Sequence, residues 1–211
     1  SSIADQVAQR LHILHLDTGA MYRTVALYML RNGIDPQDEQ TVSARCGEAD
    51  VRVAYRDGAQ RTMLGGEDVS DLIRTGEVSA AASAISKWPA VRRRMVAAQQ
   101  EIAATADMLI DGRDIGTRVL IDAPVKIFLT ATPEERARRR YQEMVNKGMD
   151  ANFDDVLRDL HARDEQDMHR TVDPLRAAED AVTVDSTNLT FDEVVEAILR
   201  IVADKTGGAQ A

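Results

Sequence analysis

Apolar positions in the first part of the chain follow a helix, strand, helix order. Apolar residues recur every three or four positions over 2–11, which is the spacing of one helix face. An apolar run over 13–16 then predicts a strand that ends at Asp17. After a turn at Thr18-Gly19, helical spacing resumes and stops at Asn32-Gly33, a pair typical of helix C-termini. The pattern predicts a strand whose end leads through a tight turn into a helix.

The pattern changes in the middle of the chain. Apolar and polar residues alternate over 51–64, with Asp57-Gly58 between the two halves, a pair typical of tight hairpin turns. Helical spacing returns over 71–105 and is interrupted at Trp88-Pro89. These residues predict a small antiparallel piece inside a mostly helical stretch.

The last third of the chain alternates strands with helices. We predict strands over 108–111, 125–129 and 181–184, and helices starting at 132, over 152–164 and over 190–202. Thr132 and Thr190 each precede a glutamate by three residues, which predicts a capping box at each helix start. Strands separated by helices imply a parallel sheet with right-handed crossovers, so the predicted fold class is α/β.

Composition narrows the possible functions. The 211 residues suggest one domain, or one domain with a smaller insert. The formal net charge of −9 argues against general binding to nucleic acids or anionic membranes. No apolar run approaches the roughly 20 residues that span a bilayer, so we expect a cytoplasmic protein without a membrane partner. The single cysteine excludes an intrachain disulfide, and the four histidines lack the spacing of a zinc site.

The acidic average hides one strongly basic segment, residues 134–147. Its cations are Arg136, Arg138, Arg139, Arg140 and Lys147. One interpretation is a solvated helix face whose charge is balanced by the neighbouring glutamates. The other is a mobile arm that closes over polyphosphate, because guanidinium groups bind phosphate oxygens bidentately.

Two further segments place polar residues directly after predicted strands. Gly112-Arg113-Asp114 follows one strand, and Thr18 to Arg23 follows another. Ligands of parallel sheets bind beyond the carboxyl ends of strands, and a helix N-terminus favours an anion. The alternatives are an internal Arg–Asp pair at the first segment and an ordinary helix cap with an exposed arginine at the second.

Arg163, Asp167 and Arg170 are spaced so that one helix face could carry all three. A carboxylate between two guanidinium groups stays ionised and suits a ribose hydroxyl beside an anion. A structural ladder of salt bridges fits the same spacing equally well.

Together and in this order, the segments resemble the cytidylate (CMP) kinase family of the bacterial type. The matching segments are 16–23, 66–70 with Ile73-Arg74, 89–92, 111–117, 122–129, 135–140, Arg163-Asp164 and 185–187. The resemblance spans nearly the whole chain and is most specific at the first and at the segment beginning with Asp111.

The resemblance implies a P-loop nucleoside-monophosphate kinase fold with three parts. These are a core with a parallel sheet, a lid, and an enlarged monophosphate-binding insert that contains a small antiparallel sheet. By position, the core would comprise 1–34 and 106–206, the lid about 132–150 and the insert 35–105, with a flexible tail at 207–211. The implied reaction is transfer of the γ-phosphate of ATP to CMP or dCMP with Mg²⁺, by a protein that we expect to be a monomer.

The same resemblance implies roles for individual residues. The implied substrate-binding residues are Thr18, Tyr22, Arg23, Ser83, Arg92, Arg113, Asp114, Arg163, Asp167 and Arg170. The implied catalytic residues are Arg113, Asp114, Arg139 and Arg140. Arg136 and Arg139 would lie near the phosphates of ATP.

One feature of the family has no counterpart in these 211 residues, namely the glycine-rich phosphate loop that ends in Gly-Lys-Ser/Thr. Ser1 and Ser2 fall where the residues just after that lysine would lie. They are therefore implied to contact ATP, and Ser1 to contact Mg²⁺. We expect a strand and this loop to precede Ser1 in the whole protein.

Two other hypotheses stay open at this point. The protein could be a kinase for another nucleoside monophosphate or a small hydroxylated acceptor. It could also be a non-catalytic nucleotide-binding domain that has lost its phosphate loop.

Overall fold

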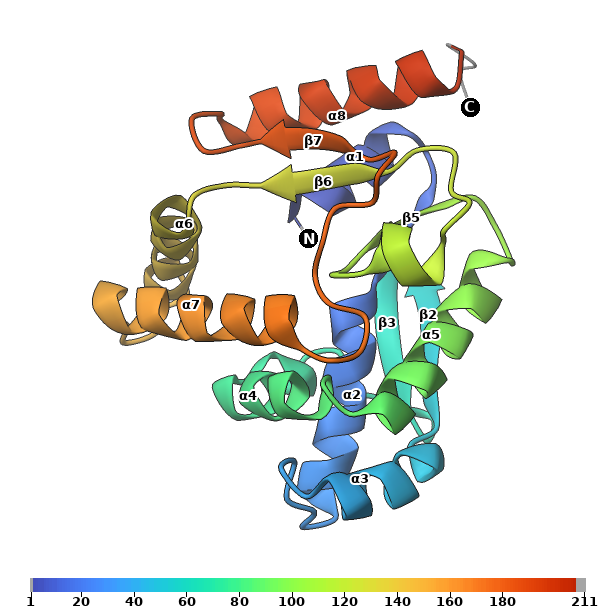
Figure 1. The fold of residues 1–211 in the computed structure, drawn as a ribbon, viewed down its shortest axis with the longest axis vertical. Helices are drawn as coiled ribbons and strands as arrows, with labels where there is room; N and C mark the ends of the chain where they lie inside the picture. The colour runs from blue at the N-terminus through green and yellow to red at the C-terminus, as the bar shows by residue number, and fades with distance from the viewer. Residues whose placement is uncertain (1, 208–211) are drawn as a thin grey trace. The chain divides into compact units, whose positions relative to one another are not determined.

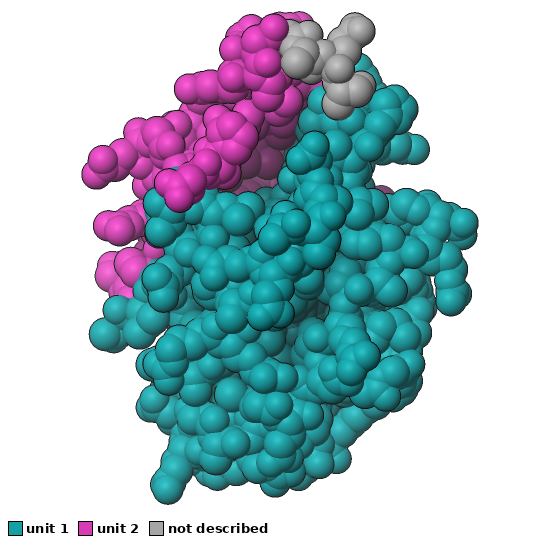
Figure 2. Space-filling view, turned by 90° about the vertical axis from the view of Figure 1, so that its right-hand side faces the viewer, with its two compact units in different colours: residues 1–121, 171–173, 211 teal, residues 122–170, 174–210 magenta. Residues whose placement is uncertain are grey.

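The computed structural model describes residues 2–207 (Figure 1), which form two compact units (Figure 2). Of these residues, unit 1 comprises 2–121 and 171–173, and unit 2 comprises 122–170 and 174–207. Each unit contains one pair of parallel strands together with helices, as the alternating pattern predicts, and unit 1 also contains an antiparallel sheet.

Unit 1 carries most of the helices and both kinds of sheet. Its helices are α1 (Ser2–Arg10), α2 (Thr18–Arg31), α3 (Glu39–Arg45), α4 (Gly76–Ile85) and α5 (Pro89–Ala103). Its strands are β1 (Leu14–Asp17), β2 (Val51–Arg56), β3 (Ala59–Leu64), β4 (Glu67–Asp68) and β5 (Met108–Asp111). Short 3₁₀ turns occupy Cys46–Glu48 and Leu72–Arg74, and a π-helical turn occupies Ile115–Val119.

The core of unit 1 forms around α2. Met21, Val25 and Met29 lie on one face of this helix and are fully buried. They join a cluster that includes Ile85 of α4 and Met95 of α5. Because Met21, Val25 and Met29 recur every four residues, the helical period aligns them toward one core.

Strand pairing brings two loops of unit 1 to the same sheet edge. β1 and β5 are parallel, and their register pairs Leu14 with Met108 and Asp17 with Asp111. Both strands therefore end side by side. The antiparallel hairpin of β2 and β3 turns at Asp57-Gly58, as the alternation predicts, and β4 adds a third strand.

Unit 2 contains one parallel strand pair and three helices. Its elements are β6 (Ile127–Thr130), α6 (Pro133–Asn146), α7 (Phe153–His169), β7 (Val182–Asp185) and α8 (Phe191–Lys205). β6 pairs with β7 from Ile127–Val182 to Thr130–Asp185. Thr190 forms the predicted capping box at the start of α8 with Glu193.

The structure corrects several details of the sequence prediction. The parallel strands form two separate pairs among residues 2–207, rather than one sheet, because alternation along the chain sets strand direction but does not choose hydrogen-bonding neighbours. Thr132 caps α6, but the side chain of Glu135 bonds to Arg138 and Arg139 and does not complete the box. α7 runs five residues beyond the predicted end at 164.

The predicted functional division of the chain stays a prediction. Contacts place the whole of 35–105 in unit 1 together with 2–34 and 106–121, but contacts do not define a monophosphate-binding insert. The predicted lid, about 132–150, corresponds to α6 and its C-terminal turn. Of the predicted tail, 208–211 lie outside the described residues. Within the described part, none of the helices has the length and apolarity to cross a membrane.

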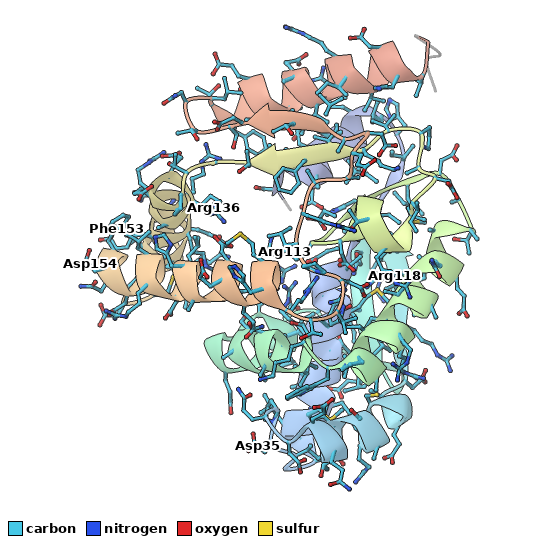
Figure 3. All side chains as sticks on the ribbon, viewed as in Figure 1. Asp35, Arg113, Arg118, Arg136, Phe153 and Asp154 are labelled. Carbon is cyan, nitrogen blue, oxygen red and sulfur yellow. The ribbon has the colours of Figure 1, made fainter. Side chains whose placement is uncertain are left out.

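An ion pair holds α6 against α7. Nη1 and Nη2 of Arg136 donate to the two carboxylate oxygens of Asp164 at 3.1 and 2.7 Å, and Nε donates to the carbonyl of Ala131 at 3.1 Å. An edge-to-face contact of Tyr141 with Phe153, 6.2 Å between ring centroids, joins the same two helices. Figure 3 labels Arg136 and Phe153. Arg136 thus ties the end of β6 to both helices.

We expect Asp164→Asn to destabilise the helix pair by about 1 kcal/mol, because it removes one charge from a bidentate, partly buried pair. The measurement is the free energy of unfolding in urea. Arg138→Met is the matched control, since Arg138 pairs with Glu135 on an exposed face of α6 and should leave stability unchanged. Equal losses of stability for the two variants would contradict a special role of the Arg136–Asp164 pair in holding α6 against α7.

Candidate functional site

The first cluster of predicted residues in unit 1 surrounds the N-terminus of α2. Asp17 caps this helix, because its carboxylate accepts from the N–H of Ala20 at 3.0 Å. Its other oxygen accepts from Nη2 of Arg23 at 2.8 Å. The helix cap therefore holds the Arg23 guanidinium, three quarters buried, beside the first turn of α2. Cationic charge and backbone N–H groups at one point suit an anion.

Thr18 connects this helix start to the end of β5. Its hydroxyl donates to the carbonyl of Asp111 at 2.7 Å, and the residue is 3% exposed. A Cβ on Gly112 would lie 2.5 Å from Oγ1 of Thr18 and 2.8 Å from Cδ1 of Ile115. Only glycine permits this close approach of the two loops.

Arg92 is the centre of the second cluster in unit 1. It lies on α5, is 2% exposed, and donates from three nitrogens to three different acceptors. Nη2 bonds to Asp114, Nε to Asp173 at 3.1 Å, and Nη1 to the carbonyl of Ser86 at 3.2 Å. Its guanidinium carbon lies 6.0 Å from the centre of the Tyr22 ring. Burial by itself lowers the pKa of Arg92, but the neighbouring Tyr22 side chain, the charge of Asp114 and the hydrogen bonds that Arg92 donates to Asp173 and Asp114 shift it upward overall, so the group stays charged.

The remaining predicted residues of unit 1 are Asp114, Arg113 and Ser83. Asp114 is 6% exposed and precedes the π-helical turn, whereas the neighbouring Arg113, labelled in Figure 3, is exposed. A π-helical turn is rare and occurs frequently at functional sites. Ser83 lies on α4 and is half-buried.

His15 of β1 lies between the carboxylates of Asp5 and of Asp111, the last residue of β5. The side chain is 7% exposed, its Nδ1 lies 2.6 Å from Asp5 of α1, and its Nε2 lies 3.2 Å from Asp111. Burial lowers the pKa of His15, but hydrogen bonds and charge from the two carboxylates outweigh it and raise the pKa above 6.5. For Asp111, burial by itself raises the pKa. The hydrogen bond with His15 and the charge of His15 contribute to lowering that pKa overall.

In unit 2, the arginines of α6 are engaged in ion pairs. Arg139 donates to Glu135 at 2.7 Å and to the carbonyl and hydroxyl of Ser186 at 2.5 and 3.1 Å. Arg140, half exposed, pairs with Glu143 at 3.0 Å. Bonds from Arg138 and Arg139 lower the pKa of Glu135 to about 2. Glutamates therefore neutralise the basic segment locally in this structure.

The other predicted residues of unit 2 lie at the C-terminal end of α7. Arg163 and Asp167 are both on this helix, and Arg170 is its C-cap residue. Nη1 of Arg170 lies 3.3 Å from Asp167, and both residues are 8% exposed, whereas Arg163 is exposed. The structure thus brings Asp167 and Arg170 into direct contact.

The residues predicted to bind ATP and Mg²⁺ through the chain start are only partly described. Ser2 is exposed and is the first residue of α1. Ser1 lies outside the described residues. Among residues 2–207, no group of three or more His, Cys, Asp or Glu side chains could hold a metal ion by itself.

Sequence reasoning missed two partners of the site. Asp173 pairs with Arg92 across 81 positions of the sequence. Gln60 of β3 forms a two-way bond with the backbone of Asp17, accepting from its N–H at 2.7 Å and donating to its carbonyl at 3.3 Å. Neither residue stands in a local motif, so periodicity and spacing carry no signal for them.

In unit 1, a helix N-terminus, a glycine loop and a buried Arg–Asp pair follow the carboxyl ends of parallel strands. This combination is typical of an α/β protein that binds phosphate groups. A family model, "Cytidylate kinase", matches residues 1–204. The chain belongs to the cytidylate kinase family and has its P-loop nucleoside-monophosphate kinase fold.

Named relatives agree with this assignment. The chain is 46% identical to a cytidylate kinase of Caldicellulosiruptor bescii over 201 residues, which cover 95% of this chain and 89% of the relative. It is 46% identical to one of Mycolicibacterium paratuberculosis, covering 98% and 91%. For one of Bacillus subtilis the identity is 40%, covering 98% and 92%.

We expect Gly112→Ala to destabilise the protein by about 1–3 kcal/mol, because the added methyl group overpacks the contact with Thr18 and Ile115. The free energy of unfolding measures this effect. Gly47→Ala is the control, since a Cβ there meets nothing within 4 Å. An unchanged stability of Gly112→Ala would show that the two loops do not need their close approach.

His15 predicts a pH-dependent contribution to stability. Because the folded state raises the pKa of His15 above 6.5, its stabilising contribution is fully present below the unfolded pKa and is lost as pH rises through the folded pKa. We expect the stability advantage of wild type over His15→Gln to shrink between pH 6 and pH 9, measured by urea unfolding. An advantage that grows with pH would have the wrong sign for this cluster.

Proposed function

We propose that this protein transfers the γ-phosphate of ATP to CMP or dCMP, giving ADP and CDP or dCDP. Membership of the cytidylate kinase family supports the reaction. The observation that supports the assignment of the base-reading residues is the buried Arg92–Asp114 pair, because a buried ion pair is a costly way to stabilise a fold and such buried charges cluster at functional sites.

Asp114, Arg92 and Ser83 would read the base. Cytosine offers an exocyclic amine beside ring acceptors, so a carboxylate together with a guanidinium and a hydroxyl group complements its edge. Uracil presents a carbonyl where cytosine has the amine. That carbonyl would face the acceptor oxygens of Asp114, and a buried acceptor–acceptor mismatch discriminates strongly.

Thr18, Tyr22, Arg23 and Arg113 would surround the acceptor phosphate. The N-terminus of α2 contributes backbone N–H groups, and the ion pair of Arg23 with Asp17 keeps a guanidinium beside them. The bond from Thr18 to the carbonyl of Asp111 holds the loop that carries Arg113 close to this helix start. These contacts are independent of the base.

Unit 2 would contribute the groups for the sugar and for the donor. Arg163, Asp167 and Arg170 would hold the sugar and phosphate, and Asp167 in its contact with Arg170 would accept from a ribose hydroxyl. Arg136, Arg139 and Arg140, with Ser1 and Ser2, would contact ATP. Arg139 and Arg140 would exchange their glutamate partners for phosphate oxygens when the lid closes.

The chemistry of phosphoryl transfer suits these residues. Such a transfer depends on positioning and on neutralising charge rather than on a covalent nucleophile, so an arginine-rich site without a catalytic serine or cysteine is expected. In the proposed roles, Arg113, Arg139 and Arg140 stabilise charge on the transferring group, and Asp114 orients the acceptor. Closure of the lid would exclude water and so limit hydrolysis of ATP.

Mg²⁺ belongs to the same proposal. Mg²⁺ usually keeps several water ligands and binds through one or two carboxylates together with substrate phosphates. A preformed cluster of protein ligands, which is not found among residues 2–207, is therefore not required. Mg²⁺ would enter with ATP and neutralise phosphate charge. We further propose that the protein acts as a monomer in the cytoplasm. Its ligands would be nucleotides, and it would have no nucleic-acid or membrane partner.

The test measures formation of ADP by the full-length protein with ATP, Mg²⁺ and CMP, dCMP, UMP or AMP in turn. We expect turnover with CMP and dCMP well above that with UMP and AMP. Preference for another acceptor would identify a different monophosphate kinase, and no acceptor-dependent ADP would indicate a non-catalytic nucleotide-binding domain. Either outcome would overturn the proposal.

Two variants separate base reading from phosphate binding. Asp114→Ala should lower kcat/KM for CMP by roughly 10²-fold or more and narrow the CMP-to-UMP ratio, because it removes the carboxylate that distinguishes the bases. Arg23→Ala should weaken every monophosphate by a similar factor and leave that ratio unchanged. Equal losses on all substrates for both variants would contradict this division of roles.

A further inference from the structure

Asp173 lies in a three-residue segment that belongs to unit 1 although its chain neighbours belong to unit 2. The chain leaves unit 2 after Arg170, packs with unit 1 over 171–173, and returns to unit 2 at Pro174. This short excursion directly follows the α7 residues that the proposed function assigns to the sugar and phosphate. The contacts of residues 171–173 are therefore contacts within unit 1.

The carboxylate of Asp173 is the anchor of this segment. Oδ2 accepts from Nε of Arg92 at 3.1 Å, and Oδ1 lies 3.5 Å from Nε of Arg118 in the π-helical turn. The Asp173 side chain is 19% exposed and that of Arg92 is 2% exposed, so the first of these bonds is shielded from water. The Arg118 side chain is half exposed, and Figure 3 labels it.

The backbone of Asp173 adopts a conformation that its local sequence disfavours. Its φ is +48°, in the left-handed region that residues other than glycine rarely adopt. Asp and Asn tolerate this region best among the other residues, because their short polar side chains can bond locally. Proline follows directly, and the residue before a proline prefers an extended conformation. The surroundings therefore impose a conformation that the local sequence disfavours.

Asp173 also decides how Arg92 meets Asp114. Each of the three donor nitrogens of Arg92 has a different acceptor, so Arg92 meets Asp114 through Nη2 while Asp173 occupies Nε. If Asp173 were absent, the edge formed by Nε and Nη2 could turn onto Asp114 and form the bidentate pair that guanidinium and carboxylate groups favour. That pair would draw the carboxylate toward Arg92 and away from a bound base.

We propose that Asp173 is a positioning residue for base recognition. It holds Arg92 in the orientation that leaves Asp114 directed at the nucleotide base, and it couples this orientation to the segment that leads out of α7. This inference rests on the proposed function of Arg92 and Asp114. It adds a residue that contacts neither the base nor the transferred phosphate and acts through Arg92.

The test compares Asp173→Ala and Asp173→Asn with wild type. For Asp173→Ala we expect KM for CMP to rise roughly tenfold, the order of loss for removing a partner of a charged hydrogen bond, with kcat nearly unchanged. The CMP-to-UMP ratio of kcat/KM should fall with it. Asp173→Asn keeps an acceptor oxygen and tolerates the left-handed backbone, so it should recover part of the loss.

Asp180→Ala is the matched control. Asp180 forms an ion pair with Lys126 at 2.7 Å in unit 2, and neither residue belongs to the proposed site. It should leave KM and the CMP-to-UMP ratio at wild-type values. Thermal unfolding of all variants checks that they fold, and a drop in kcat at unchanged KM for Asp173→Ala would overturn the positioning role.

A ligand-free measurement separates this inference from the proposed function. Because the Nε–H of Arg92 is buried and bonded to Asp173, it should give a slowly exchanging ¹⁵Nε–¹Hε signal in NMR, assigned through its absence in Arg92→Lys. Asp173→Ala should shift this signal and speed its exchange with water, while Asp180→Ala should not. An unchanged signal would refute the positioning role even if the wild-type protein phosphorylates CMP. A changed signal in a protein without CMP kinase activity would overturn the proposed function alone.

Discussion

The parallel register of β1 and β5 is the constraint on which the candidate site of unit 1 depends. It places Asp17 beside Asp111, so both strands end at the same edge of the sheet. From this edge, β1 leads into α2 and β5 leads into the loop that contains Gly112. Because parallel strands end at the same edge, loops separated by more than 90 residues become neighbours. The bond from Thr18 to Asp111 and the absence of a side chain at Gly112 then lock the loops together.

Buried charge is the second theme of the molecule. Arg92 lies almost wholly out of water, and such a guanidinium is stable only when hydrogen bonds and opposite charge replace its hydration. Asp114, Asp173 and the carbonyl of Ser86 supply these. His15 follows the same rule between Asp5 and Asp111. In both clusters, hydrogen bonds and opposite charge offset a desolvation cost that apolar side chains would not incur.

The arginine side chains of α6, in unit 2, are less buried than that of Arg92. The arginines of α6 lie at the surface or partly buried and pair with carboxylates on their own helix or on α7. The Arg140–Glu143 pair is half exposed, and exposed pairs of this kind contribute little to stability, whereas Glu135 is mostly buried and accepts from both Arg138 and Arg139. Arg136 is the exception, because its three donor nitrogens tie α6 to Asp164 and to the end of β6. The same segment thus contains both the Arg136 contacts that join three elements and exposed pairs that contribute little to stability.

The sequence by itself determined the local elements and the motifs that lie within them. Hydrophobic spacing predicted most of the helices and strands, although not α3 or β4. Asp57-Gly58 predicted the hairpin turn, and the order of short motifs identified the cytidylate kinase family, because these signals depend on residues close together in the chain. The tertiary structure alone decided that the parallel strands form two pairs, that Glu135 bonds to arginines rather than completing a cap, and that Asp173 and Gln60 contact the site. These outcomes depend on which distant segments meet, and the burial that selects those meetings is a property of the packed chain rather than of any local pattern.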